Sequence, residues 1–334
     1  MLESALIINL KKNYNLSNPV ILKNLGGFKS HNLLILEGDK NLVLKCISNT
    51  DAVKAKKLIH TWKFLDHHKM PVPKIIPAVS GESITIIQNQ FCILNENQAG
   101  KCFHETNFNE FSLKNTAETL FKFHQLGRSA FKELSSFFEI SLKQKKQSKS
   151  LDLLQILNTV KNDKIKNILM ENVKSRKKLM TTLQLEKIEN FALRMNELIH
   201  GDFHNENILY TDSHHISSLL DFENVRIGDG FTDVIHFIRL GCCNTGFNEN
   251  NLHLANIFAK NYLSYDPRSE ENIIQNIKLY LKNYTESYFF ENLFFKTKNS
   301  LYLKFIERDT KTFQYFSSRF DDFYQKVFMG SHFY

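Results

Sequence analysis

The hydrophobic periodicity of this 334-residue chain changes near residue 107. Before that point, short β-type runs alternate with turn residues, as in VILKNL, NLLILE and NLVLKCI, which are separated by Gly-Gly and EGDK. This spacing is typical of antiparallel hairpins. We therefore expect strands over 20–25, 32–37 and 41–47, and two more in ITIIQ and FCILN, joined by a tight turn at Asn89 and Gln90.

One predicted helix interrupts this β-rich region. The stretch TDAVKAKKLIHTWKFLDHHK begins with N-cap candidates and repeats its apolar residues at nearly a 3.6-residue period, which predicts a helix over 51–69. After residue 107, patterns such as NEFSLKNTAETLFKFHQLGR and LEKIENFALRMNEL predict amphipathic helices, and only NILY and ISSLLD predict further strands. The expected fold class is α+β, with a small antiparallel β lobe and a larger, mainly helical lobe.

These regions predict an organisation in two lobes. We expect lobes of 1–95 and 96–334, joined by a hinge at about 94–100, with a ligand held between them. A hydrophobic content of 42% and a charged content of 23% are typical of globular proteins. QKKQSKS is the segment that most resembles a flexible link.

Composition also predicts the cellular context. The sequence has neither a secretory signal nor an apolar stretch that would span a membrane, and its five cysteines form no CxxC pair. We therefore expect a cytoplasmic protein with reduced thiols. Basic clusters at 142–149 and 174–178 lack interleaved aromatic residues, which favours solvated surface over nucleic-acid binding. Nothing in the sequence specifies an oligomeric state.

The segment HGDFHNENILYTDSHHISSLLDFE, residues 200–223, carries the candidate chemistry. Pairing of its two strands as a hairpin would bring Asn207 and Asp221 side by side, with Asp202 on the loop that leads in. Oxygen ligands of this kind suit Mg²⁺, which is commonly held by one or two protein carboxylates together with substrate phosphates. Asp202 would then accept a proton from an attacking hydroxyl or orient it.

Histidines near this segment allow a second interpretation. His200 and His204 are four residues apart, and His214 and His215 follow, so a zinc site is conceivable. Gly201 and the loop between the histidines argue against a two-histidine helix face. The magnesium interpretation is therefore favoured.

HGDFHNEN followed by LLDFE resembles the HGDxHxxN and D-[FWI]-[DE] motifs of the aminoglycoside phosphotransferase and choline kinase superfamily, which has a protein-kinase-like fold. The resemblance implies a catalytic Asp202, metal ligands Asn207 and Asp221, and supporting roles for His200 and Asp233. It leaves Glu223 as a second metal contact, a substrate group or a surface residue. Nucleotide-binding positions implied by the resemblance are Gly26, Gly27 and Ser30 in the glycine-containing loop, Lys45 on the third strand, and Asn95 and Asn97 at the hinge.

One departure from the family pattern concerns Lys45. Many relatives pair the strand lysine with a glutamate on the following helix, whereas the helix predicted over 51–69 contains no glutamate. Three alternatives remain open: Asp51 replaces it, Lys45 meets the phosphates unaided, or the enzyme is damaged.

The resemblance implies ATP or GTP as co-substrate, Mg²⁺ as cofactor, and a hydroxyl acceptor. Gly201 stands where protein kinases usually carry an arginine, and the short segment between Asp221 and Asp233 leaves no room for peptide docking. A small acceptor is therefore expected, such as an aminoglycoside, a choline-like alcohol, homoserine or a sugar. A cationic acceptor would need acidic residues, for example among Glu286, Glu291 or Glu307. The alternatives are a nucleotide-binding pseudokinase or scaffold and, less favoured, a kinase acting on protein.

Overall fold

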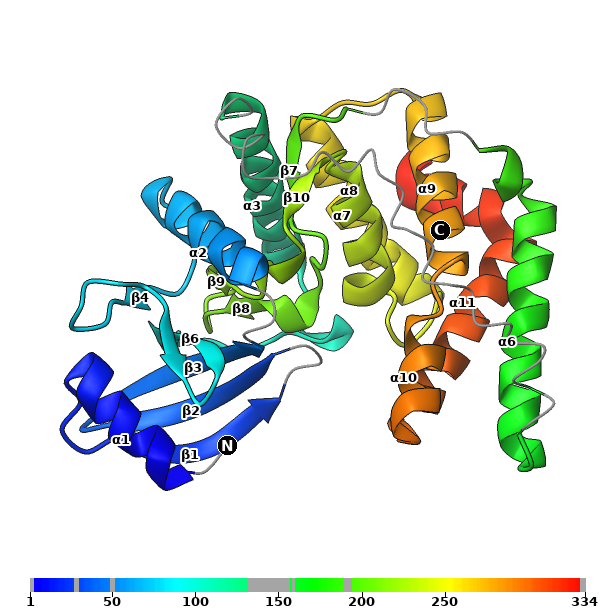
Figure 1. Ribbon diagram of the computed structural model, residues 1–334. Helices are drawn as coiled ribbons and strands as arrows, with labels where there is room; N and C mark the ends of the chain where they lie inside the picture. Colours follow the sequence, from blue (N-terminus) through cyan, green and yellow to red (C-terminus); the bar gives the residue numbers. More distant parts are fainter. Residues whose placement is uncertain are drawn as a thin grey trace. The chain divides into compact units, whose positions relative to one another are not determined.

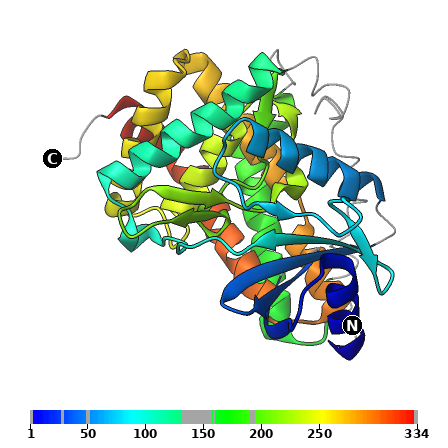
Figure 2. The same cartoon turned by 90° about the vertical axis from the view of Figure 1, so that its left-hand side faces the viewer.

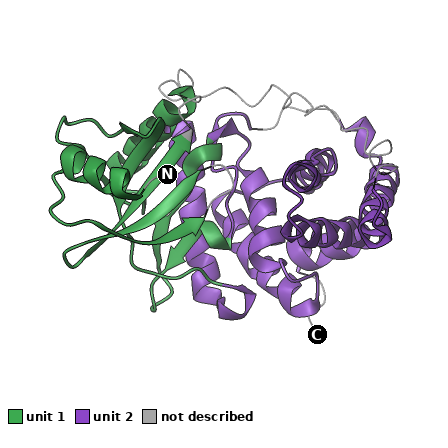
Figure 3. Cartoon of the chain, turned by 60° about the horizontal axis from the view of Figure 1, so that its bottom comes forward, with its two compact units in different colours: residues 1–103, 205–225 green, residues 104–204, 226–334 purple. Residues whose placement is uncertain are grey.

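The computed structural model describes residues 3–26, 30–48, 52–130, 157, 160–188 and 194–330. The chain forms two compact units, of which the first contains residues 1–103 and 205–225 and the second residues 104–204 and 226–334 (Figure 3). The predicted link QKKQSKS and the helical pattern LDLLQILNTV lie outside the described residues, apart from Leu157 and Val160. None of the helices in the described ranges is long and apolar enough to cross a membrane.

The first unit is built on an antiparallel sheet (Figure 1). Its strands follow the order β1-β2-β3-β6-β4, and β5 also pairs with β6. The three strands predicted in the first fifty residues are confirmed, as are the two predicted in ITIIQ and FCILN. The bounds are β1 Val20–Gly26, β2 His31–Glu37, β3 Lys40–Ser48, β4 Ile75–Ile76, β5 Thr85–Ile87 and β6 Gln90–Glu96.

The turn between β5 and β6 lies one residue earlier than predicted. Gln88 and Asn89 both have positive φ, of 48° and 62°, whereas Gln90 already pairs with Ile87. Two successive left-handed residues are typical of a two-residue hairpin whose twist matches that of its strands. The strand therefore begins at Gln90.

The first unit contains two helices before residue 100, although the sequence predicted only one. The predicted helix is α2, Ala52–His67, and the missed one is α1, Glu3–Tyr14. Leu6, Leu10 and Tyr14 recur at four-residue spacing and are buried in the same apolar core as the sheet, so α1 lies against the sheet (Figure 2). The four-residue spacing of these apolar residues is the signal in the sequence that indicates this helix.

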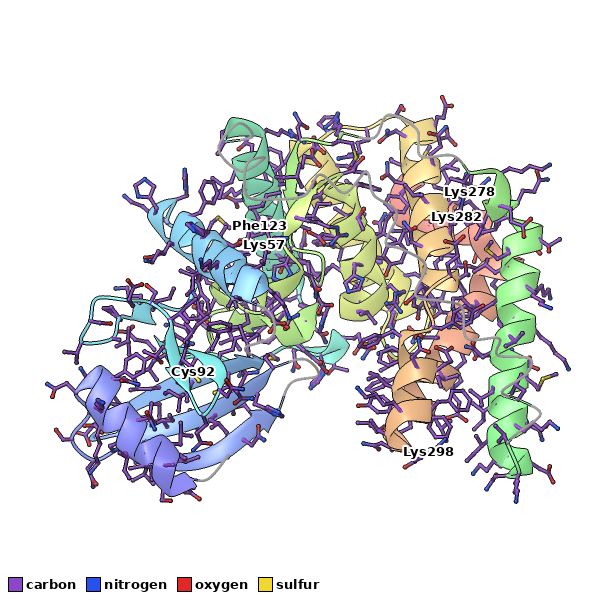
Figure 4. All side chains as sticks on the ribbon, viewed as in Figure 1. Lys57, Cys92, Phe123, Lys278, Lys282 and Lys298 are labelled. Atoms are coloured by element: carbon purple, nitrogen blue, oxygen red, sulfur yellow. The ribbon has the colours of Figure 1, made fainter. Side chains whose placement is uncertain are left out.

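Four of the five cysteines are buried and all are free thiols. Cys92 on β6 is labelled in Figure 4, and its Sγ lies 3.3 Å from Sγ of Cys46 on β3. The hydrogen bond to Cys46, together with burial, raises the pKa of the Cys92 thiol. These two cysteines therefore belong to the core of the sheet rather than to a reactive site.

The predicted hairpin near residue 210 is also confirmed, as β8, Ile208–Tyr210, and β9, Ile216–Leu219. It is fastened to the rest of the first unit by backbone hydrogen bonds. Lys101 and Tyr210 exchange N–H and C=O groups at 3.0 and 2.9 Å, and Leu219 N–H donates to the Pro71 carbonyl at 2.6 Å. These bonds fix the position of the polar residues at the end of the hairpin.

The second unit is mainly helical, as predicted. Its longer helices within the described ranges are α3 Glu110–Ser129, α6 Asp163–Thr182, α8 Glu249–Tyr265, α9 Glu270–Thr285, α10 Phe289–Thr297 and α11 Leu301–Tyr324. A short helix, α7, Phe231–Phe237, continues into a π-helical turn, Ile238–Cys242.

A second two-stranded sheet corrects the end of the helix predicted in LEKIENFALRMNEL, of which residues 189–193 lie outside the described residues. The end of that segment forms β7, Glu197–Ile199, which pairs with β10, Arg226–Gly228. β7 lies against α3 at Gly127, where a Cβ atom would come within 1.9 Å of the Leu198 nitrogen. All three β7 residues are buried, and a fully buried short strand cannot be distinguished from a helix by periodicity alone.

Buried charges hold the ends of this sheet in place. Arg268, with a fully buried side chain, lies 2.7 Å from Asp229, 3.0 Å from Asp266 and 3.3 Å from Glu197. Glu197 also accepts the Gly230 N–H, at 2.6 Å. Paired and hydrogen-bonded charges of this kind are strongly destabilised when one partner is lost. The network therefore fixes the backbone that leads into α7.

Candidate active site

The end of the β8–β9 hairpin brings the two predicted metal ligands together. Leu220 N–H donates to the carbonyl of Asn207 at 2.9 Å, so Asp221 follows directly after a residue paired with Asn207. Asp221 has a φ of 57°, a left-handed conformation that aspartate tolerates better than most residues, and its side chain is 37% exposed. The backbones of Asn207 and Asp221 are thus close together at one hairpin end, where the Asp221 carboxylate is accessible.

Lys45, on β3, pairs with the residues that follow this hairpin. Its Nζ lies 3.0 Å from Asp221 Oδ1 and 2.7 Å from Glu223 Oε1. Burial by itself would lower the pKa of Lys45, but the charges of Asp221 and Glu223 outweigh it and raise the pKa. The ammonium is therefore charged at neutral pH and is held beside the predicted metal ligand.

Glu223 also has a second cationic partner. Its Oε2 lies 2.6 Å from Nζ of Lys54 on α2, and its side chain is only 3% exposed. Burial would raise the pKa of Glu223, but the Lys45 charge and hydrogen bonds from Lys45, Lys54 and Ser30 lower it to about 2. A surface role for Glu223, one of the three interpretations left open by the sequence, is wrong because the side chain is buried.

The remaining predicted nucleotide contacts are described in part. Gly26 ends β1 with a φ of 86°, and among the described residues, its chain neighbours aside, no atom lies within 4 Å of the position that a Cβ would take. Its N–H donates to Asn24 Oδ1 at 2.9 Å, so in this structure that N–H already has an acceptor. Ser30 is buried. Gly27 and Asp51 lie outside the described residues.

The two hinge residues lie at the end of β6. Asn95 is buried and pairs with Val43 on one side and Ile75 on the other. The Asn97 N–H donates to the Asn41 carbonyl at 3.0 Å. The role of this segment in binding a nucleotide base stays a prediction, and in this structure the Asn97 N–H already has an acceptor.

Asp202 lies in the second unit, on a loop held by Asp233. The Asp233 carboxylate accepts the His200 N–H at 2.7 Å and the Gly201 N–H at 2.9 Å. His124 Nε2 lies 3.3 Å from the same carboxylate. Burial would raise the pKa of Asp233, but the hydrogen bond to His124 and nearby charges lower it. This is the geometry that a loop-supporting Asp233 requires.

Two histidines face the Asp202 carboxylate. His236 Nε2 lies 3.4 Å and His204 Nε2 lies 3.6 Å from Asp202 Oδ1. Burial would raise the pKa of Asp202, but the neighbouring His236 imidazole, with smaller contributions from His204 and His200, holds it well below its usual range. Asp202 is therefore ionised at neutral pH and can act as a hydrogen-bond acceptor.

A chain of polar groups reaches His236 from the side away from Asp202. Arg239 Nε donates to the Tyr280 hydroxyl at 2.8 Å, and that hydroxyl lies 2.9 Å from His236 Nδ1. Nε2 is therefore the ring nitrogen that faces Asp202. Burial lowers the pKa of His236 to about 4, so the neutral imidazole predominates at neutral pH.

Sequence reasoning missed Lys54 and His236. Lys54 is in the first turn of α2, the helix in which the family pattern predicts an acidic residue. His236 follows Asp233 by three residues and so lies one helical turn further along α7. That spacing was the available signal.

The donor set at the hairpin end fits Mg²⁺. Among the described residues, no group of three or more His, Cys, Asp or Glu is arranged to hold a metal ion. Asn207 and Asp221 would thus provide two oxygen ligands, and water and phosphate oxygens would complete the shell. Asp202 belongs to the other compact unit, and its approach to this pair stays a prediction.

Comparison with known proteins identifies the family. Residues 20–270 match the phosphotransferase enzyme family. The chain belongs to this family. The match spans the glycine-containing loop, Lys45, the hairpin and Asp233, and thus all the residues predicted for the site.

Solved structures of similar fold are phosphotransferases as well. A spectinomycin phosphotransferase, APH(9)-Ia, in complex with ADP and spectinomycin has a TM-score of 0.69 and 13% identity, with coverage of 95% of this chain and 99% of that one. The amicoumacin kinase hAmiN in complex with AMP-PNP, Ca²⁺ and Ami has a TM-score of 0.61 and 13% identity, with coverage of 94% of this chain and 93% of that one.

The GDP and kanamycin complex of APH(2")-IIIa gives a TM-score of 0.61 and 15% identity, with 93% and 99% coverage. These likenesses confirm the predicted α+β, kinase-like fold of this family member. A comparison with curated protein sequences found no match.

Proposed function

We propose that this phosphotransferase moves the terminal phosphoryl group of ATP or GTP to a hydroxyl of a small molecule, with Mg²⁺ as cofactor. The observation that carries the proposal is the ion pair of 3.0 Å between Lys45 and Asp221. It joins a charged phosphate-binding candidate to a candidate metal ligand within one compact unit. Phosphoryl transfer depends on this kind of positioning and charge neutralisation.

Each residue has a role in the proposed reaction. Lys45 binds phosphate oxygens, and backbone groups near Gly26, Gly27 and Ser30 approach the same phosphates. Bound Mg²⁺, held by Asn207 and Asp221, supplies charge neutralisation. Asp202 accepts a hydrogen bond from the acceptor hydroxyl and orients its oxygen toward the phosphorus. Support for this role comes from its ionised state, which His236 stabilises.

The lobes and hinge complete the proposal. A hinge at 94–100 between lobes 1–95 and 96–334 would let the two parts close on the nucleotide, whose base the Asn95 to Asn97 segment would bind. The pseudokinase alternative relied on the lack of a helix glutamate. Because Asp221 and Glu223 both pair with Lys45, the lysine does not lack an acidic partner.

Acceptor choice remains within the classes predicted above. Of the three acids named for a cationic acceptor, Glu291 is buried and its Oε1 lies 2.6 Å from Arg176, whereas Glu286 and Glu307 are exposed. Glu291 therefore has a structural partner already. Exposed acids such as Glu286 and Glu307 stay candidates for an aminoglycoside or a choline-like alcohol.

An acceptor panel tests the function directly. Purified protein would be incubated with ATP or GTP, Mg²⁺ and each acceptor class, and ADP or GDP release would be followed by a coupled assay. The proposal predicts acceptor-dependent release that stops when Mg²⁺ is chelated. Nucleotide binding without release for any acceptor would favour the scaffold, and radiolabel appearing on polypeptide would favour a protein kinase.

A further inference from the structure

A single buried carboxylate connects two lysines from different elements of the first unit. Glu223 follows β9, and its two oxygens face different partners: Oε1 lies 2.7 Å from Lys45 on β3, and Oε2 lies 2.6 Å from Lys54 on α2. Ser30, at the start of β2, adds a hydrogen bond from its side chain. Three otherwise separate parts of the unit thus meet at one side chain.

Helix α2 presents a base where an acid was expected. Within its bounds, Ala52–His67, the only acidic residue is Asp66, close to the C-terminal end. The side chain that reaches the site from its first turn is Lys54. A lysine there cannot pair with Lys45, so the two ammonium groups need an anion between them.

The Glu223 carboxylate is that anion. The side chains of Lys45 and Glu223 are 9% and 3% exposed, and Lys54 is 23% exposed, so the bridge is largely protected from water. Separation of a buried ion pair is costly because each charge would be left without a partner and without water. The pair therefore holds its two side chains in place. Lys45 and the first turn of α2 are therefore tied to the loop that carries Asp221.

We infer that Glu223 is a positioning residue that holds Lys45 for phosphate binding from the loop after β9, and that Lys54 anchors Glu223 to helix α2. Relative to a lysine–glutamate pair between strand and helix, the lysine stays on the strand, the carboxylate comes from the loop after β9, and the helix contributes a second lysine. This inference rests on the proposed function for its kinetic consequences, and on geometry alone for the bridge.

The two lysine contacts of Glu223 favour a positioning role over a role as a metal ligand. Both Glu223 oxygens are already within 3 Å of a lysine nitrogen. A divalent cation bound by either oxygen would have to displace or face an ammonium group, which is electrostatically unfavourable. Asp221, with a more exposed side chain, is the better ligand.

A relocation of the carboxylate tests the inference. The variants are Glu223→Gln, Lys54→Glu, and both together, in which the acid moves from the loop to the helix. Lys56→Glu makes the same charge change at an exposed position of α2 and serves as the control. Metal-free nucleotide affinity, measured with a fluorescent ATP analogue in chelator, and acceptor-dependent turnover are the two readouts.

We expect Glu223→Gln to weaken metal-free nucleotide binding and turnover by about tenfold or more, because Lys45 loses its nearest anion. The double variant should recover to within about threefold of wild type, and Lys56→Glu should match wild type. If Glu223→Gln instead leaves metal-free binding intact and only raises the Mg²⁺ requirement, Glu223 is a metal ligand and the inference is wrong. Equal losses in the double and single variants, or melting-temperature loss without kinetic change, would also overturn it.

A further measurement separates this inference from the proposed function. The reaction of Lys45 with an amine-selective acylating reagent, followed by peptide mapping, needs no acceptor and no turnover. In Glu223→Gln, Lys45 loses the anion that stabilises its charged form, so more of it is the reactive neutral amine and its labelling rate should increase. The double variant should reverse this increase. An unchanged rate would contradict the bridge itself, whereas wild-type protein that labels as expected but transfers no phosphate would contradict only the proposed function.

Discussion

The imidazole of His236 lies between Asp202 and Tyr280, with Nε2 at 3.4 Å from the Asp202 carboxylate and Nδ1 at 2.9 Å from the Tyr280 hydroxyl. The ring belongs to α7, the tyrosine to α9 and the aspartate to the loop before α7. The proposed catalytic carboxylate thus faces an imidazole whose other nitrogen contacts the Tyr280 hydroxyl. These three residues belong to one compact unit, so their contacts do not depend on lobe closure.

Replacement of His236 by leucine should change the pH profile of transfer. Loss of the His236 imidazole raises the pKa of Asp202, so the acid limb of kcat/KM should move to higher pH by about one unit. His253→Leu, at an exposed position on α8, is the control and should leave the profile unchanged. Superimposable profiles for wild type and His236→Leu would show that the histidine does not act on Asp202.

His236 also predicts how stability depends on pH. The pKa of His236 is about 4 in the folded protein, against 6.5 for an unperturbed histidine such as that of the unfolded chain. Between pH 4 and 6.5, the unfolded chain therefore binds a proton that the folded protein does not. The free energy of unfolding should therefore fall as pH decreases from 6.5 to 4, by up to about 3 kcal/mol from this residue. Glu223, with a pKa lowered to about 2, adds a further loss below pH 4.5.

Urea unfolding at several pH values measures this dependence. His236→Gln cannot take up the proton, so its unfolding free energy should vary less than that of wild type between pH 6.5 and 4. An identical pH dependence in both proteins would mean that His236 is protonated in the folded state.

The strands, the motif spacing and the hairpin could be predicted from the sequence. The ion-pair partners of the site's side chains could not. Asn207 and Asp221 could be placed side by side because a hairpin of short strands has only one register that buries Ile208 and Leu219. No local pattern indicates that Lys54 meets Glu223, since these residues are far apart in sequence and meet only through tertiary packing. β7 was missed for a related reason: its burial comes from α3 and β10, not from its own periodicity.

Arg268 should be important for stability rather than for chemistry. Arg268→Leu removes the common partner of Glu197, Asp229 and Asp266, and we expect the free energy of unfolding to fall by about 3–5 kcal/mol. Lys260→Leu, at an exposed position of α8, should change it by less than about 0.5 kcal/mol. Thermal unfolding followed by circular dichroism provides the comparison. Arg128 also contacts Glu197 and Asp266, and Arg194 contacts Asp266. A melting temperature equal to that of wild type would contradict the prediction and show that these two arginines suffice for the carboxylates.

The metal ligands can be tested within the hairpin. Asp221→Asn and Asn207→Ala should each raise the Mg²⁺ concentration for half-maximal turnover by at least about tenfold, because each removes an oxygen donor. Asp212→Asn changes an exposed aspartate of the same hairpin, whose partner is Lys101 at the surface. It should leave the Mg²⁺ requirement unchanged. Equal requirements in all three variants and wild type would exclude this hairpin end as the cation site.

Acceptor-dependent ADP release by Asp202→Asn, measured beside nucleotide affinity, tests the central claim most directly. The substitution keeps the size of the side chain but removes the charge that receives the acceptor proton. We predict a loss in kcat of about 10²–10⁴-fold with nucleotide affinity within about twofold of wild type. Turnover equal to that of wild type in Asp202→Asn would contradict the assignment of Asp202, and with it the proposed mechanism.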